Sequence, residues 1–213
     1  VWDKCIRVAE LARVIANRVG VDAALATRAA ALGKCDLMSR MVGEFPELQG
    51  IMGRDYASQG NQPEVAEVAS ALDEFYRPRN AADGIAEGKL GQVLAVAERL
   101  DTLTGIFAVG MKPSGNKDPF ALRRHALGVV RMLIERDLPL DLSWLFQTAQ
   151  LADDKVAAQL ADFIYERLAG SLREQGYSAL EVDAVVGLRP QRLGDIPKRL
   201  AAVRAFAALP EAA

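Results

Sequence analysis

Apolar residues recur every three or four positions along almost the whole chain. The first segment shows this spacing at Ile6, Ala9 and Val14, and no segment alternates apolar and polar residues with an excess of β-branched types. The pattern predicts an all-α protein of about eight to ten helices. We expect helices at residues 3–19, 22–43, 47–58, 63–76, 88–108, 118–136, 153–175, 178–187 and 195–208.

Proline and capping residues set the expected helix boundaries. Pro63 is placed to begin a helix, and Asp118 followed by Pro119 predicts another start, because an aspartate caps the free amides of a first turn. Residues 138–141, Leu-Pro-Leu-Asp, form the best candidate hinge, since they follow a complete helix. We therefore expect two domains, residues 1–137 and 138–213.

The composition is that of an ordinary globular protein. Of 213 residues, 51% are hydrophobic and 25% are charged, with a formal net charge of -2. Without an overall basic excess, any RNA contact must be a local patch. No secretory signal or membrane-length apolar run is visible, and Cys5 and Cys35 lie in predicted helices, so we expect a cytoplasmic protein without disulfides. A start at Val1 rather than methionine indicates a piece of a longer polypeptide.

Residues 30–36, Ala-Ala-Leu-Gly-Lys-Cys-Asp, resemble the helix that presents a His-Asp pair to a divalent metal in HD-family phosphohydrolases. Here Cys35 stands in the histidine slot. Lys4 stands in the slot of the first histidine ligand, and Glu98 in that of the last aspartate. The resemblance implies an HD-type helical domain.

The resemblance also implies that the metal site has been lost. A protonated lysine repels the cation that such a site needs, and the only histidine, His125, lies elsewhere in a predicted helix, where we expect a structural role. We expect Lys4 to form an ion pair with Asp36, and a vestigial site without metal at Lys4, Cys35, Asp36 and Glu98. The alternative is a metal-dependent phosphohydrolase with Asp36, Glu98 and Asp101 as remaining ligands.

Three longer blocks resemble, in the same order, the beta subunit of bacterial-type glycyl-tRNA synthetase. They are residues 34–53 (KCDLMSRMVGEFPELQGIMG), 100–107 (LDTLTGIF) and 117–124 (KDPFALRR). Residues 166–209 resemble the start of the helical anticodon-binding domain shared with arginyl-tRNA synthetases. The likeness covers essentially the whole chain, and it implies an HD-type helical domain followed by the truncated start of an anticodon-binding-like bundle.

This family resemblance implies a division of labour between two subunits. A separate alpha subunit carries the class II site that activates glycine with ATP, whereas the beta subunit supports binding of the tRNA. The resemblance therefore implies the alpha subunit and tRNA-Gly as partners and no membrane contact. It also implies no cofactor and no catalytic residue in this chain, which alone is expected to be inactive.

Two basic groups are the candidates for tRNA contact, because phosphate contacts come mainly from lysine and arginine. The first group is Lys112, Lys117, Arg123, Arg124 and Arg131, and the second is Arg189, Arg192, Lys198 and Arg199. Both groups can equally be solvated helix faces, and a module that only docks the alpha subunit is a further alternative. Gly50 and Gly53 lack the sequence context of a phosphate-binding loop, so we expect them to permit a tight turn or close helix packing.

Overall fold

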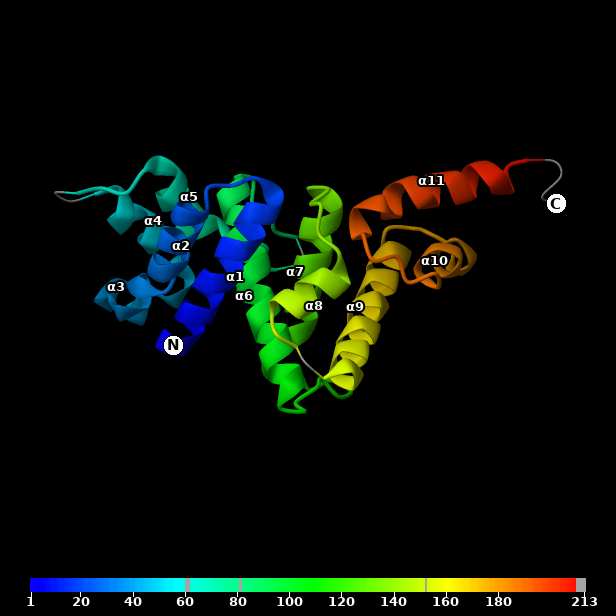
Figure 1. Ribbon diagram of the computed structural model, residues 1–213, viewed down its shortest axis with the longest axis horizontal. Coiled ribbons are helices and arrows are strands. Elements are labelled where there is room, and N and C mark those ends of the chain that lie inside the picture. The colour runs from blue at the N-terminus through cyan, green and yellow to red at the C-terminus, as the bar shows by residue number, and fades with distance from the viewer. Residues whose placement is uncertain (60–61, 81, 152, 210–213) are drawn as a thin grey trace. The chain divides into compact units, whose positions relative to one another are not determined.

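The computed structural model describes residues 1–59, 62–80, 82–151 and 153–209 (Figure 1). Over these residues it contains eleven α-helices and three short 3-10 helices, and it contains no β-strand. The all-α prediction is therefore confirmed. The chain folds as two compact units, Val1–Thr102 and Leu103–Ala213, and the division falls inside one helix, α6 (Lys89–Ala108). None of the described helices is long and apolar enough to cross a bilayer.

The first unit contains two helix pairs and the first part of α6. Its longer helices are α1 (Trp2–Val19), α2 (Ala23–Leu32), α4 (Ile51–Ser58) and α5 (Ala66–Glu74). α1 packs against α2, α4 against α5, and α2 against α5. Ala12 and Ala16 of α1 and Ala26 and Ala29 of α2 are fully buried, and their small side chains let the helices pack closely.

Residues 22–43, predicted as one helix, form three short ones, so that prediction was wrong. After α2 come the 3-10 helix η1 (Cys35–Met38) and α3 (Arg40–Glu44), followed by the 3-10 helix η2 (Pro46–Leu48). The second break lies at Ser39, whose extended backbone and side-chain oxygen, which accepts from the N–H of Val42, begin α3. Serine favours this capping position over a helix interior. The breaks place Cys35 and Asp36 in a separate turn.

The second unit holds the end of α6 and the remaining helices. They are α7 (Leu122–Glu135), α8 (Leu142–Thr148), α9 (Asp154–Glu174), α10 (Ala179–Val186), the 3-10 helix η3 (Leu193–Asp195) and α11 (Ile196–Ala207). α7 packs against α9 and η3, and α10 packs against α9 and α11. The helix ends predicted at 153–175, 178–187 and 195–208 are confirmed to within one residue.

Two predicted helix starts were wrong by about one turn. α5 begins at Ala66 rather than at Pro63, and α7 begins at Leu122 rather than at Asp118. Ala121, directly before α7, has a left-handed backbone with φ 52°, so the helix cannot extend back through it. Asp118 nevertheless caps α7, because its carboxylate accepts from the backbone N–H of Leu122 at 2.8 Å and of Arg123 at 2.9 Å.

The expected domain boundary between residues 137 and 138 stays a prediction. Contacts connect the two sides of this position within the second unit. The backbone N–H of Leu142 donates to the carbonyl of Gln191, and Asp137 pairs with Arg192 at 2.9 Å. α7 and α9, which that boundary separates, pack directly against each other.

Candidate functional site

The side chain of Lys4 lies against α6, the helix that carries Glu98 and Asp101. Its ammonium group donates to Asp101 Oδ2 at 2.9 Å and to Thr102 Oγ1 at 2.8 Å, and it lies 3.5 Å from Glu98 Oε2. Asp101 and Glu98 are three residues apart on one helix, so both carboxylates point to the same face. The ammonium group therefore lies between two nearly buried carboxylates.

Two further cations complete this cluster, one on each carboxylate. Arg7, one turn after Lys4 on α1, donates from Nε to Asp101 Oδ1 at 2.6 Å. Lys34, just after α2, lies 3.0 Å from Glu98 Oε1, and its ammonium group lies 4.8 Å from the ring centroid of Tyr76. Three positive side chains thus surround two negative ones, so the cluster carries a formal excess of one positive charge.

The electrostatics of the cluster keep Asp101 ionised. Burial alone would raise the pKa of Asp101, but hydrogen bonds from Arg7 and Lys4 outweigh burial and hold that pKa below its ordinary value. Both oxygens of the carboxylate are engaged by these cations. A carboxylate in this state is a poor general base and has no free oxygen pair for a metal ion.

The expected ion pair between Lys4 and Asp36 is wrong. Asp36 is buried, and its Oδ2 accepts from the backbone N–H of Gly50 at 2.6 Å, while its Oδ1 has no hydrogen-bond partner among the described residues. The phenol of Tyr76 is close enough to Asp36 and Glu98 to feel both charges. Burial and these two charges raise the pKa of Tyr76 far above its ordinary value, so the phenol is neutral.

Gly50 has the role that the sequence predicted for it. Its backbone is left-handed, with φ 83°, and a Cβ atom there would lie only 2.5 Å from the Tyr76 ring. Glycine is therefore required by both conformation and space. This close contact fixes the N–H of Gly50 against Asp36.

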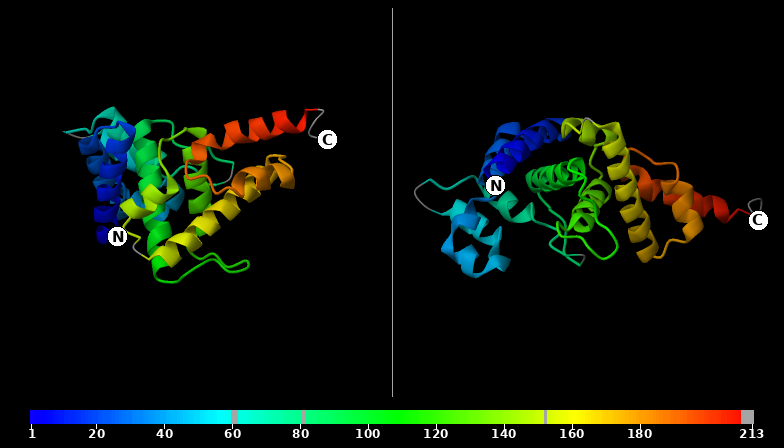
Figure 2. Two further views of the ribbon diagram at one scale, coloured as in Figure 1. Left: turned by 45° about the vertical axis from the view of Figure 1, so that its right-hand side comes forward. Right: turned by 90° about the horizontal axis from the view of Figure 1, so that it is seen from below.

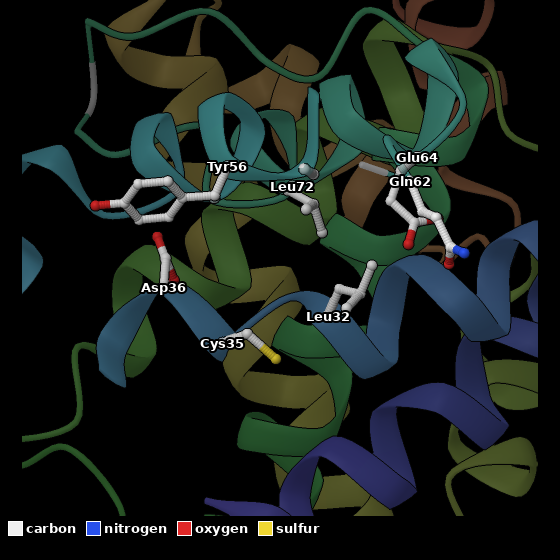
Figure 3. Close-up of a pocket in the computed structure, with 9 residues that line it drawn as sticks. Leu32, Cys35, Asp36, Tyr56, Gln62, Glu64 and Leu72 are labelled. Atoms are coloured by element: carbon white, nitrogen blue, oxygen red, sulfur yellow. The ribbon is translucent and has the colours of Figure 1, made fainter. Parts of the chain in front are cut away.

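A cavity of about 270 Å³ lies beside Cys35 and Asp36 (Figure 3). Figure 3 shows Leu32 pointing toward Leu72 and Asp36 pointing toward Tyr56, while the thiol of Cys35 points away from Tyr56. The thiol of Cys35 is exposed and lies 3.7 Å from the carbonyl of Ala31. Among the described residues, no group of three or more His, Cys, Asp and Glu side chains is arranged to hold a metal ion.

Another buried carboxylate, Asp73, was not singled out from the sequence. Its oxygens accept from Arg79 at 2.8 Å and from Arg54 and Arg77 at 3.2 Å each. Burial would raise the pKa of Asp73, but these three arginines, Arg79 foremost, hold it below its ordinary value. Arg99, itself buried, donates to the carbonyls of residues 75–77. These bonds join α4, α5, α6 and the loop after α5.

The predicted tRNA-binding residues fall into two classes in the structure. Some are engaged within the fold: Arg123 donates to the Gly115 carbonyl, and the others pair with carboxylates, namely Arg131 with Glu135, Arg189 with Asp162, and Arg192 with Asp137. The rest lie in exposed positions, within 4 Å of no carboxylate that the structure describes. They are Lys112, Lys117, Arg124, Lys198 and Arg199.

The sequence of the chain is similar to known aminoacyl-tRNA synthetase components. A glycine–tRNA ligase beta subunit from Paracidovorax citrulli is 59% identical over 97% of this chain, and one from Dechloromonas aromatica is 57% identical over 97%. One from Methylobacillus flagellatus is 48% identical over 99%. This chain spans 30% of the length of the first two relatives and 31% of the third.

The family profile for the glycyl-tRNA synthetase beta subunit matches residues 1–187. The match covers all of the first structural unit and most of the second. The chain therefore belongs to the glycyl-tRNA synthetase beta subunit family.

Proposed function

We propose that this chain is the part of a glycine–tRNA ligase beta subunit that supports tRNA-Gly, beside an alpha subunit that activates glycine with ATP in the cytoplasm. Family membership carries the proposal. The chain itself is proposed to bind no ATP and to perform no chemistry. In support, the carboxylates of Glu98 and Asp101 form ion pairs with Lys4, Arg7 and Lys34. Carboxylates paired in this way are poorly suited to act as catalytic acids or bases.

The RNA contacts are proposed to come from basic side chains that the fold leaves uncommitted. Lys198 and Arg199 lie side by side near the start of α11 and are exposed. An arginine already paired with a carboxylate, such as Arg131 with Glu135, would have to give up that partner to bind a phosphate. A cation without a carboxylate partner loses no ion pair when it binds a phosphate, so it is the better phosphate contact.

Filter binding of glycine tRNA to the complete alpha-beta complex across a salt series tests this role. Log affinity falls as log salt rises, and each lost phosphate contact should reduce the steepness of that fall by about 0.7–0.9. We expect K198Q/R199Q to make tRNA binding less dependent on salt. K155Q, at an exposed lysine on α9, should leave the salt dependence unchanged. A wild-type complex without salt-dependent tRNA binding would contradict the proposed function.

The rival reading, a metal-dependent phosphohydrolase, makes an opposite prediction. Elemental analysis of the purified protein should then find manganese, iron, nickel or zinc in stoichiometric amount, together with phosphatase activity. The ion pairs of Glu98 and Asp101 argue against it, because a bound cation would have to displace an ammonium or guanidinium group from each.

A role in subunit assembly is supported by a separate observation. Large apolar side chains are exposed along the segment from η1 to α4, namely Leu37, Met38, Met41, Phe45 and Ile51, with Met38 89% exposed. Apolar side chains gathered along an exposed segment are typical of a protein–protein interface. We propose that this segment docks the alpha subunit.

Co-purification of the two subunits tests the docking proposal. We expect M38E/M41E to weaken recovery of the alpha subunit, because charged side chains would be buried without partners. L180E, at an apolar side chain 83% exposed on α10, is the matched control and should retain the alpha subunit. Equal recovery of both variants would argue against this surface.

A further inference from the structure

The loop between α6 and α7, residues 109–121, is folded rather than irregular. Ser114 and Lys117 exchange both backbone hydrogen bonds, at 3.1 and 2.9 Å, and this pairing closes a tight turn at the loop tip. In the left view of Figure 2 this green segment extends beyond the end of α6 as a two-armed projection. The loop thus presents a defined surface to solvent.

The loop encloses a cavity of about 300 Å³. This volume lies at the lower end of the range of small-ligand sites, about 300–1,000 Å³, and is sufficient for one nucleobase. Phe120 and Met111 line it and remain 41% and 53% exposed. The lining also includes Pro113, Pro119 and Leu122, together with the charged residues Lys112, Lys117 and Asp118. An accessible aromatic ring therefore stands at the edge of a mostly apolar hollow.

Positive charge exceeds negative charge around this hollow. Lys112 and Lys117 line it, and no carboxylate of the described residues lies within 4 Å of either ammonium group. Asp118 is the only acid in the lining, and both of its oxygens are occupied by the backbone amides that begin α7. Arg123, next to the loop, donates to the Gly115 carbonyl and keeps its charge unneutralised. The hollow is therefore suited to an anionic ligand.

Two other cavities lack this combination. The cavity beside Cys35 is lined by Asp36 and Glu64, two acids that would repel a phosphate. The cavity of about 240 Å³ between α7, α9 and α11 contains Arg131, which is paired with Glu135. Of these three cavities, the loop cavity alone brings an exposed ring and unpaired cations together.

We propose that the loop cavity is a binding site for one unpaired nucleotide of an RNA. The base stacks on Phe120, and its flanking phosphates contact Lys112 and Lys117. Aromatic rings recognise unpaired bases in this way because every base has a π-face, whereas a base inside a duplex is already stacked. The inference rests on the proposed tRNA-binding function and adds the kind of RNA element that this surface recognises.

The test uses the complete alpha-beta complex, a glycine tRNA transcript and three variants. F120A should weaken tRNA binding by roughly tenfold, the loss expected for one base–aromatic stack, while F120W should bind as the wild type does. K112Q/K117Q should reduce the magnitude of the slope of log affinity against log salt by about one to two. L180A, which removes an exposed apolar side chain on α10, is the control for F120A and should bind normally.

Two outcomes separate this inference from the function on which it rests. A wild-type complex that binds tRNA while F120A binds equally tightly overturns the nucleotide site and leaves the proposed function standing. A wild-type complex that does not bind tRNA overturns both. As a second readout, a single-stranded RNA should compete with the tRNA better than a duplex of equal length, and F120A should abolish that preference. An unchanged preference in F120A would also overturn the site.

Discussion

The ammonium group of Lys4 holds together parts of α1 and α6 that are about a hundred residues apart in the sequence. It donates to Asp101 and Thr102, and Thr102 in turn donates to the Glu98 carbonyl at 3.0 Å. Asp101 is almost fully buried, whereas Lys4 is about a quarter exposed. The pair therefore lies between a surface salt bridge, which contributes little, and a fully buried one, whose disruption is severe.

Replacement of Lys4 by methionine should destabilise the protein by about 1–3 kcal/mol. Methionine retains an apolar stem, so the loss reports mainly on Asp101, which loses its ammonium partner and keeps its bond from Arg7. Urea unfolding followed by circular dichroism measures the change. R13Q, which breaks the exposed pair with Glu10, is the control and should unfold at the wild-type urea concentration. Identical midpoints for K4M and R13Q would contradict a structural role for Lys4.

Stability should fall on acidification, and Asp101 should contribute to the fall. Its pKa is lower in the folded state than the value of about 3.9 expected for the unfolded chain. The stabilisation is therefore complete above the unfolded pKa and is lost as the pH falls through the folded pKa. The urea midpoints of wild type and D101N should differ most above the unfolded pKa and converge as the pH falls through the folded pKa of Asp101. A difference that does not change with pH would show that Asp101 acts by packing alone.

At the scale of single elements, α7 shows how a side chain can start a helix from a distance. Asp118 lies outside the helix, yet its two oxygens accept from the amides of Leu122 and Arg123. D118A should cost about 1 kcal/mol, as the loss of a helix cap does. Amide hydrogen exchange should accelerate in the first turn of α7, and D118N, which keeps one acceptor oxygen, should show a smaller effect. Unchanged exchange in D118A would mean that Ala121 alone fixes the helix start.

The helical pattern of the sequence predicted element type better than element boundaries. α1, α6 and α9 follow it closely because each is a long helix with a sustained series of apolar positions, and the carboxylate of Asp153 also caps α9. The breaks within 22–43 were missed because the apolar spacing continues through Ser39, while the local capping bond decides the backbone. Periodicity records which face is buried and is insensitive to such a local bond.

The candidate site was predicted only in part, and the reason is again physical. The resemblance pointed to Lys4 and Glu98, but the partners Asp101 and Lys34 follow from packing between α1, α2 and α6. One sequence signal was available. Lys4 and Arg7 are three residues apart, and so are Glu98 and Asp101, which places each pair on one helix face. Which faces meet depends on long-range packing, and so the pairing with Asp36 was predicted instead.

At the scale of the whole chain, the domain boundary predicted between residues 137 and 138 can be tested by separation. In the second unit, the α7 side chains Val129, Met132 and Leu133 are buried. α7 packs against α9 and η3, which lie beyond that boundary. A fragment of residues 138–213 would expose the surface that α7 covers. Such a fragment would also lose the ion pair of Arg192 with Asp137.

We therefore expect residues 103–213 to unfold cooperatively in urea and residues 138–213 to unfold without a sharp transition. Burial of apolar surface contributes roughly 25 cal/mol per Å², so the loss of one helix face removes several kcal/mol from a small unit whose total stability is of similar size. Circular dichroism of both fragments measures this directly. A cooperative transition for residues 138–213 would instead support a domain that begins at 138, because only an independently packed core unfolds in one step.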